Sequence, residues 1–164
     1  MIWNLIIRPI RFFYIIILKL LKKEYTEDSW QALEQFIKFS IVGLSNTLLS
    51  YLINIGVLKL LESFEISWDF YVANIVAFVI TVIWSFYWNR KYVFHSSKTS
   101  VRAVFAELMK TFMAYAFTGL LLANVLSYVW IELLSISKYI APLINLIISV
   151  PTNFLINKFW TFKE

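Results

Sequence analysis

Two short segments of this sequence share a pattern of residues that could bind an anion. Residues 89–94 read Asn-Arg-Lys-Tyr-Val-Phe, and residues 157–162, 68 positions later, read Asn-Lys-Phe-Trp-Thr-Phe. In each segment an amide is followed by a cation, by an aromatic ring two places on, and by a phenylalanine two places beyond that ring. Arginine binds phosphate oxygens through a planar fork, and lysine acts as a point charge. The candidate phosphate contacts are Asn89, Arg90, Asn157, Lys158 and Trp160.

The same cations also fit an ordinary structural role. A basic residue at the end of a membrane-spanning helix commonly reaches the headgroups and fixes the orientation of the helix. Tyr92 and Trp160 would then belong to the aromatic belt of the membrane interface. The pattern occurs in both halves of the chain, each time after a row of polar residues. This recurrence favours the phosphate interpretation over the anchor, and both remain open.

Amide and hydroxyl side chains recur on one face of the first, second and fourth apolar segments, while the third has a weaker set with Asn124 on another face. At ~3.6 residues per turn, Gly43, Asn46, Thr47, Ser50 and Asn54 of the first apolar segment lie within an arc of about 100°. One interpretation is helix packing, because hydrogen bonds between membrane helices contribute ~0.6–2 kcal/mol each. The other is a polar groove for a sugar, because an amide offers both a donor and an acceptor. The candidate groove residues are Asn46, Asn54, Asn74, Ser85, Asn145 and Asn153.

The elements that position these residues follow from composition. Hydrophobic residues make up 60% of the chain and charged residues 15%, against about 25% charged in a soluble domain. Charges bracket four uncharged windows of 20, 20, 21 and 19 residues, which match the ~20 residues that a transmembrane helix needs. The sequence therefore predicts an all-α integral membrane protein with four transmembrane helices arranged as two repeated hairpins. We expect one membrane domain over residues 29–164, with helices at about 36–59, 70–92, 108–132 and 138–160.

Basic residues fall mostly on one side of these helices. Of the 15 lysines and arginines, all but Lys59 and Lys138 precede the first window, separate the second from the third, or follow the fourth. Since basic residues near short loops stay in the cytoplasm, both termini are predicted to be cytoplasmic. The net charge of +5 then reflects topology and contact with anionic phospholipids. It does not indicate nucleic-acid binding, because the cations flank helices instead of lining a groove with stacking aromatics.

The segment before the first window has its own amphipathic pattern. In residues 1–23, five basic side chains share an arc of about 120° on a helical wheel, opposite an apolar face. This pattern predicts an interfacial helix whose basic face contacts lipid headgroups, with residues 1–28 forming the helix and its linker. A helix that docks on a partner protein is the alternative.

Several kinds of chemistry are not indicated. The chain has no cysteine, and its one histidine, His95, lies beside two serines in a loop where we expect it to be solvated. The sequence offers no embedded acid–base pair, metal cluster, activated nucleophile or glycine-rich phosphate loop. We therefore predict that the protein is not an enzyme and uses no cofactor or metal.

Taken together, these motifs resemble the GtrA-like family, small four-span membrane proteins that work with polyprenyl-phosphate glycosyltransferases. The resemblance covers roughly residues 34–163. It rests on residues 36–39, 42–43, 46–47, 50–51 and 73–74 and on the two endings. The second ending is close to the family pattern. The first departs from it, because Ser85 stands where asparagine is common and Tyr92 where tryptophan is common.

The resemblance implies that the protein moves an undecaprenyl-phosphate-linked sugar from the cytoplasmic to the outer leaflet of a bacterial cytoplasmic membrane. The sugar would later be used in cell-envelope polysaccharide glycosylation. Implied partners are the polyprenyl-phosphate-linked sugar lipid and a membrane glycosyltransferase, and a homodimer is possible. A scaffold that recruits the glycosyltransferase without moving lipid is the main alternative. A small multidrug exporter fits less well, because it needs an embedded carboxylate and Glu34, Glu107 and Glu132 lie at helix ends.

Overall fold

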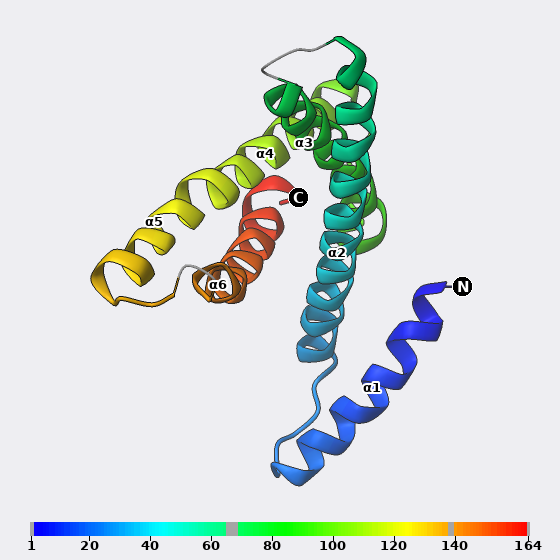
Figure 1. Ribbon diagram of the computed structural model, residues 1–164. Helices are drawn as coiled ribbons and strands as arrows, with labels where there is room; N and C mark the ends of the chain where they lie inside the picture. Colours follow the sequence, from blue (N-terminus) through cyan, green and yellow to red (C-terminus); the bar gives the residue numbers. More distant parts are fainter. Residues whose placement is uncertain (1, 65–68, 138–139, 164) are drawn as a thin grey trace.

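The computed structural model describes residues 2–64, 69–137 and 140–163, and every regular element in these ranges is a helix (Figure 1). The α-helices are α1 (Ile2–Leu20), α2 (Glu27–Leu61), α3 (Asp69–Trp88), α4 (Val101–Ala116), α5 (Ala123–Tyr128) and α6 (Ala141–Ile156). A 3-10 turn, η1 (Glu62–Phe64), follows α2. The π-helical turns are η2 (Asn89–Val93), η3 (Phe117–Leu122), η4 (Val129–Leu133) and η5 (Asn157–Thr161).

Three helices in the described ranges are long and apolar enough to cross a membrane: Glu27–Leu61, Tyr71–Val93 and Val101–Leu133. This confirms the prediction of an all-α membrane protein. The consecutive elements α6 and η5 form a helical segment where the fourth span is predicted, but three asparagines lower the mean hydropathy of this segment. The four-span hairpin arrangement therefore stays a prediction. Residues 138–139, the predicted start of the fourth span, lie outside the described residues.

Helices α2 and α4 are longer than the apolar windows that predict the first and third spans, because capping residues start both helices early. Thr26 caps α2, and its Oγ1 accepts a hydrogen bond from the Ser29 N–H at 3.3 Å. Ser100 caps α4 in the same way, with its Oγ accepting from the Ala103 N–H at 3.3 Å. Such caps satisfy backbone donors that the first helical turn leaves unpaired. Both helices therefore begin before the apolar window begins.

The helices pair along the sequence. In Figure 1, α3 runs beside α2, while α4, α5 and α6 slope away from that pair. The C-terminal turn of α6 returns to the side of α2 and α4. The endings of α3 and α6, far apart in the sequence, thus meet in one region.

Four phenylalanine rings stack where these endings meet. Phe94 and Phe162 lie 4.9 Å apart between ring centroids, with an interplanar angle of 18°. Phe86 stacks on Phe162 at 6.0 Å, and Phe154 stacks on Phe94 at 5.9 Å. Because each ring has a counterpart 68 positions away, the two outer contacts are the same contact made in opposite directions. The two endings therefore contact each other reciprocally.

The backbone of the two endings is also the same. Each begins a π-helical turn at a fully buried asparagine, Asn89 or Asn157. The asparagine carbonyl accepts the N–H of the phenylalanine five places on, at 2.9 Å in both endings. The repeated sequence pattern thus encodes a repeated local structure, which delivers one phenylalanine from each half to the stack.

Helix α1 folds back beside the N-terminal part of α2 (Figure 1). Arg11 forms an ion pair with Glu27 at 2.7 Å, and the rings of Trp3 and Tyr92 lie 6.3 Å apart. The exposed apolar side chains of this segment include Leu5, Phe12, Phe13, Ile17, Leu20 and Leu21. An amphipathic helix with such a face suits the membrane interface. Its position in the membrane remains a prediction.

We predict that Phe94 and Phe162 stabilise the fold as a coupled pair. Replacing either ring with leucine should lower the thermal stability of the detergent-solubilised protein, because stacked rings contribute ~0.5–1.5 kcal/mol beyond their burial. The double variant should lose less than the sum of the single losses, since both changes remove the same contact. Phe105→Leu, at an exposed position, is the control and should have little effect. Strictly additive losses would show that the stack does not couple the endings.

Candidate functional site

A polar cavity of about 550 Å³ lies between α2, α3 and the α4–η3 segment. We call it the polar groove. Its lining residues are Asn46, Thr47, Ser50, Tyr51, Asn54, Asn74, Phe78, Thr81, Tyr115 and Gly119. The structure therefore brings the predicted site residues Asn46, Asn54 and Asn74 to one cavity. Its volume is in the range of small-molecule sites.

The groove carries several hydrogen-bonding groups at fixed positions. Asn54 Nδ2 donates to Asn74 Oδ1 at 2.8 Å and ties α2 to α3. The hydroxyl of Thr81 donates to the Ala77 carbonyl at 2.7 Å, which leaves its lone pairs available. Among the described residues, the buried Oδ1 of Asn46 has no hydrogen-bond partner. A buried acceptor without a partner is costly, so a ligand hydroxyl at Asn46 would lower the free energy of the site.

Ser85 and Asn89 belong to a chain of hydrogen bonds that reaches Tyr115, a residue of the groove lining. The Ser85 Oγ is 2.6 Å from the hydroxyl of Tyr115, and both are largely buried. Asn89 Nδ2 donates to the same Ser85 Oγ at 3.4 Å. These two hydrogen bonds fix the position of the Tyr115 hydroxyl and link the groove to the first ending, residues 89–94. Ser85 and Asn89 are themselves absent from the groove lining.

The predicted site residues of α6 have a different environment. Asn145 Nδ2 donates to Ser127 Oγ at 2.7 Å and to the Ala123 carbonyl at 3.1 Å, and its Oδ1 accepts from Trp130 Nε1 at 3.0 Å. These bonds use the Asn145 amide to pack α6 on the α5 region. Asn153 Oδ1 accepts from Asn157 Nδ2 at 3.0 Å. Neither Asn145 nor Asn153 lines the groove, so the packing interpretation fits Asn145 best.

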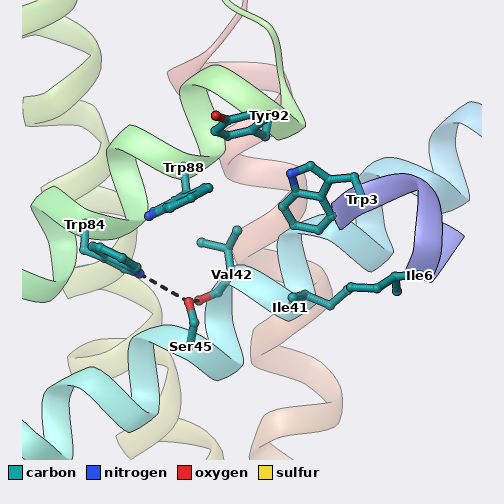
Figure 2. A pocket seen from close by; sticks show the side chains of 8 residues that line it. All are labelled: Trp3, Ile6, Ile41, Val42, Ser45, Trp84, Trp88 and Tyr92. Carbon is teal, nitrogen blue, oxygen red and sulfur yellow. Dashed lines mark hydrogen bonds between the residues drawn. The ribbon is translucent and has the colours of Figure 1, made fainter. Parts of the chain in front are cut away.

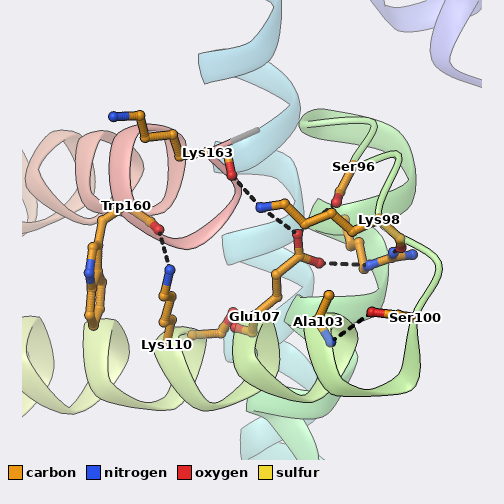
Figure 3. Close-up of polar contacts among 10 residues, drawn as sticks. Ser96, Lys98, Ser100, Ala103, Glu107, Lys110, Trp160 and Lys163 are labelled. Carbon is orange, nitrogen blue, oxygen red and sulfur yellow. Dashed lines mark hydrogen bonds and ion pairs between the residues drawn. The ribbon is translucent and has the colours of Figure 1, made fainter.

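Arg90 is held by a buried carboxylate that sequence analysis did not connect with it. Arg90 Nε donates to Glu107 Oε2 at 2.9 Å, and the Glu107 side chain is only 2% exposed. Ser96 Oγ donates to Glu107 Oε1 at 2.7 Å, and Lys98 Nζ lies 3.6 Å from the same oxygen (Figure 3). A signal was available, because Glu107 is the one acidic residue between Asp69 and Glu132.

The same network holds the segment between α3 and α4 against the C-terminal end of the chain. Arg90 Nη2 donates to the Lys98 carbonyl, and Lys98 Nζ donates to the Lys163 carbonyl. On the neighbouring turn, Lys110 Nζ donates to the Trp160 carbonyl at 3.2 Å and lies over the Trp160 ring (Figure 3). Arg90 and Trp160 thus both have structural partners.

Lys158 differs from its counterpart Arg90. Its ammonium lies 5.7 Å from the ring centroid of Phe154 and 5.9 Å from that of Phe159. In the described part of the chain, Lys158 forms no ion pair with a carboxylate. A single phosphate site that uses both cations, as the repeated endings suggest, therefore remains a prediction without a direct contact between them.

A second, aromatic cavity of about 410 Å³ lies between α1, α2 and α3 (Figure 2). Its lining residues are Trp3, Ile6, Ile41, Val42, Ser45, Trp84, Trp88 and Tyr92. Trp84 Nε1 donates to Ser45 Oγ at 3.2 Å and joins α3 to α2. Sequence analysis missed this cavity, although Trp84, Trp88 and Tyr92 recur at intervals of four and therefore share a helix face.

Comparisons with known proteins agree with this architecture. The Listeria monocytogenes cell wall teichoic acid glycosylation protein GtcA is 27% identical over 125 residues, covering 72% of this chain and 86% of GtcA. The Pyrococcus furiosus dolichol-phosphate mannosyltransferase is 30% identical over 148 residues, covering 89% of this chain but only 39% of that enzyme. A family model described as GtrA/DPMS, transmembrane domain, matches residues 38–162, and the chain therefore belongs to this family.

Proposed function

We propose that this protein moves a polyprenyl-phosphate-linked sugar from the cytoplasmic to the outer leaflet of a bacterial cytoplasmic membrane, for cell-envelope glycosylation. The observation that carries the proposal is the polar groove, where Asn46, Asn54 and Asn74 of two apolar helices line one cavity. The relatives support the substrate class, because one is named for teichoic acid glycosylation and the other for dolichol phosphate.

The chemistry of the groove suits a sugar that crosses hydrocarbon. Moving a hydroxyl from water into an apolar medium without a hydrogen-bond partner costs about 2–7 kcal/mol. Amides and hydroxyls in the groove offer replacement partners, and all of its lining side chains are uncharged at neutral pH. An uncharged groove does not hold a phosphate midway. The polyprenyl tail can remain in lipid, because the cavity is open on one side and needs to enclose only the headgroup.

A scaffold for a membrane glycosyltransferase is the second candidate. It is favoured by Asn145, whose hydrogen bonds pack helices and need no ligand. The multidrug exporter is disfavoured, since the buried Glu107 is already paired with Arg90. Whether the protein is a transporter or a scaffold, we propose that it is not itself an enzyme. The mannosyltransferase activity in the name of the second relative belongs to a protein of which this chain spans 39%.

We further propose that both termini and the segment between α3 and α4 are cytoplasmic. Contacts between Trp3 and Tyr92 and between Lys98 and Lys163 support this, because they gather the N-terminal helix, that segment and the C-terminal end at the same end of the bundle. The segments that meet here carry Arg90, Lys91, Lys98, Lys158 and Lys163, and basic residues near short loops are expected on the cytoplasmic face.

The topology predicts which side an impermeant thiol reagent can reach. The chain has no cysteine, so Thr99→Cys and Glu62→Cys each provide a single thiol at an exposed position. In intact spheroplasts the reagent should label Glu62→Cys and spare Thr99→Cys. Both should be labelled after the membrane is permeabilised. Labelling of Thr99→Cys in sealed cells would reverse the proposed orientation.

Transport itself is tested by reconstitution in liposomes with a labelled polyprenyl-phosphate sugar. The measurement is how fast the sugar becomes accessible to a modifying reagent on the opposite side of the membrane. Asn46→Leu and Asn54→Leu should slow this rate by about tenfold or more, since losing one hydrogen bond to a sugar costs roughly 1–2 kcal/mol. The matched control is Asn124→Leu, because Asn124 is exposed outside the groove and donates to the Leu120 carbonyl.

If wild-type and protein-free liposomes give the same rate, the transport proposal fails. The scaffold reading would then gain support if the glycosyltransferase still co-purifies with Asn46→Leu and Asn54→Leu. Membrane insertion and thermal stability of each variant must match the wild type for the comparison to hold.

A further inference from the structure

A third cavity, of about 630 Å³, lies between α3 and α4 at the basic end of the bundle. We call it the rim cavity. Its polar residues are Tyr87, Arg90, Lys91, His95 and Ser96, and its apolar wall includes Ile83 and Leu108. It shares no lining residue with the polar groove. The two cavities can therefore be tested separately.

The local backbone brings these polar residues together. Arg90 and Lys91 belong to the π-helical turn that ends α3. His95 has a positive φ of 51°, and the following Ser96 N–H donates to the Arg90 carbonyl at 3.1 Å. This tight turn returns the chain toward α3 and places His95 and Ser96 beside the cations. A non-glycine residue with positive φ is uncommon, so the turn is a specific feature of this segment.

The rim cavity has more positive charge than its surroundings balance. Glu107 neutralises Arg90 through Nε, while Arg90 Nη2 binds the Lys98 carbonyl. Lys91 Nζ contacts the Tyr87 hydroxyl at 3.2 Å and lies 5.1 Å from the Tyr92 ring centroid. Among the described residues, no carboxylate forms an ion pair with Lys91. An anion in the cavity would meet an unbalanced ammonium and the imidazole of His95.

The apolar wall of the rim cavity indicates that the ligand also has an apolar part beside its anionic group. Ile83 lies seven residues before Arg90 on the same helix, about 10 Å along its axis at 1.5 Å per residue. Both residues belong to a helix that is apolar enough to cross a membrane. A ligand that fills the cavity therefore has a phosphate-sized anion at the rim and an apolar chain that runs along α3 and α4 toward the hydrocarbon.

We propose that the rim cavity binds the phosphate of the polyprenyl lipid, with Lys91 and His95 as direct donors to its oxygens. Arg90, held by Glu107, forms the wall of this site. This inference rests on the proposed function for the identity of the lipid. The rim cavity differs from the polar groove in chemistry, because a charged donor suits the phosphate and neutral amides suit the sugar.

The test measures binding of undecaprenyl phosphate to the full-length chain in nanodiscs of phosphatidylcholine. Undecaprenol lacks the phosphate, inorganic phosphate lacks the tail, and phosphatidylglycerol carries a different lipid phosphate. Undecaprenyl phosphate should bind at least about tenfold more tightly than each of these three probes, since one charge-assisted hydrogen bond contributes roughly 1.5–3 kcal/mol. Equal binding of undecaprenol or phosphatidylglycerol would overturn the proposal.

The variants locate the site. Lys91→Gln combined with His95→Gln should weaken undecaprenyl phosphate binding about tenfold or more, whereas Lys91→Arg should retain it. Both residues are exposed, so the double variant is expected to fold, and the single Lys91→Gln variant provides the same test if it does not. The control is Arg102→Gln, which removes an exposed cation of α4 outside the cavity. Unchanged affinity in the Gln variants would overturn the proposal.

The outcome is separable from that of the proposed function. Asn46→Leu should keep wild-type affinity for undecaprenyl phosphate while slowing transport. If no variant or wild-type protein transports the lipid but the Lys91 and His95 changes still abolish binding, the rim site stands and the transport proposal fails. If transport occurs and binding is insensitive to both residues, the reverse holds.

Discussion

The contact between the rings of Phe94 and Phe162 is the interaction on which the arrangement of the helices depends. Lipid tails are as apolar as leucine, so membrane helices gain little from hydrophobic burial against each other and rely on specific packing. The stacked rings, 4.9 Å apart, provide such packing between two endings far apart in the sequence. Each ring is delivered by a π-helical turn that begins at a buried asparagine. The turns also fix where the cations that follow each asparagine leave the helix.

The two endings share a backbone but differ in chemistry. Arg90 is neutralised by the buried Glu107, whereas the ammonium of Lys158 lies over the ring of Phe154. The polar groove is likewise formed by α2, α3 and the α4–η3 segment, and the amides of α6 contribute nothing to its lining. The repeated pattern therefore describes the local structure of the two endings, while the candidate sites are asymmetric. In the proposed function, these unequal polar residues serve an anion at the rim cavity and a sugar in the polar groove.

The sequence predicted the helices well because apolar windows and repeated endings are local signals. It predicted a membrane span at about 36–59 but not that α2 begins at Glu27, since a hydropathy window detects the apolar segment and not the cap at Thr26. It could not separate Asn46 from Asn145, because both are amides on a polar face and only their partners on other helices distinguish them. The pairing of Arg90 with Glu107 had only a weak signal, the isolation of Glu107 among apolar and basic residues, because the path of the turn that brings the two helices together is not given by the sequence pattern.

The distribution of charge fits the proposed translocation better than a uniformly basic path would. A phosphate that binds several unpaired cations in a site of low dielectric would be held too tightly to leave. Glu107 pairs with Arg90 and lies near Lys98, so that Lys91 is left as the lining cation without a described carboxylate partner in that cavity. Beyond the rim, the groove offers only neutral donors and acceptors. The headgroup can thus exchange water for hydrogen bonds while the phosphate meets no second cation in the groove, which keeps both entry and release accessible.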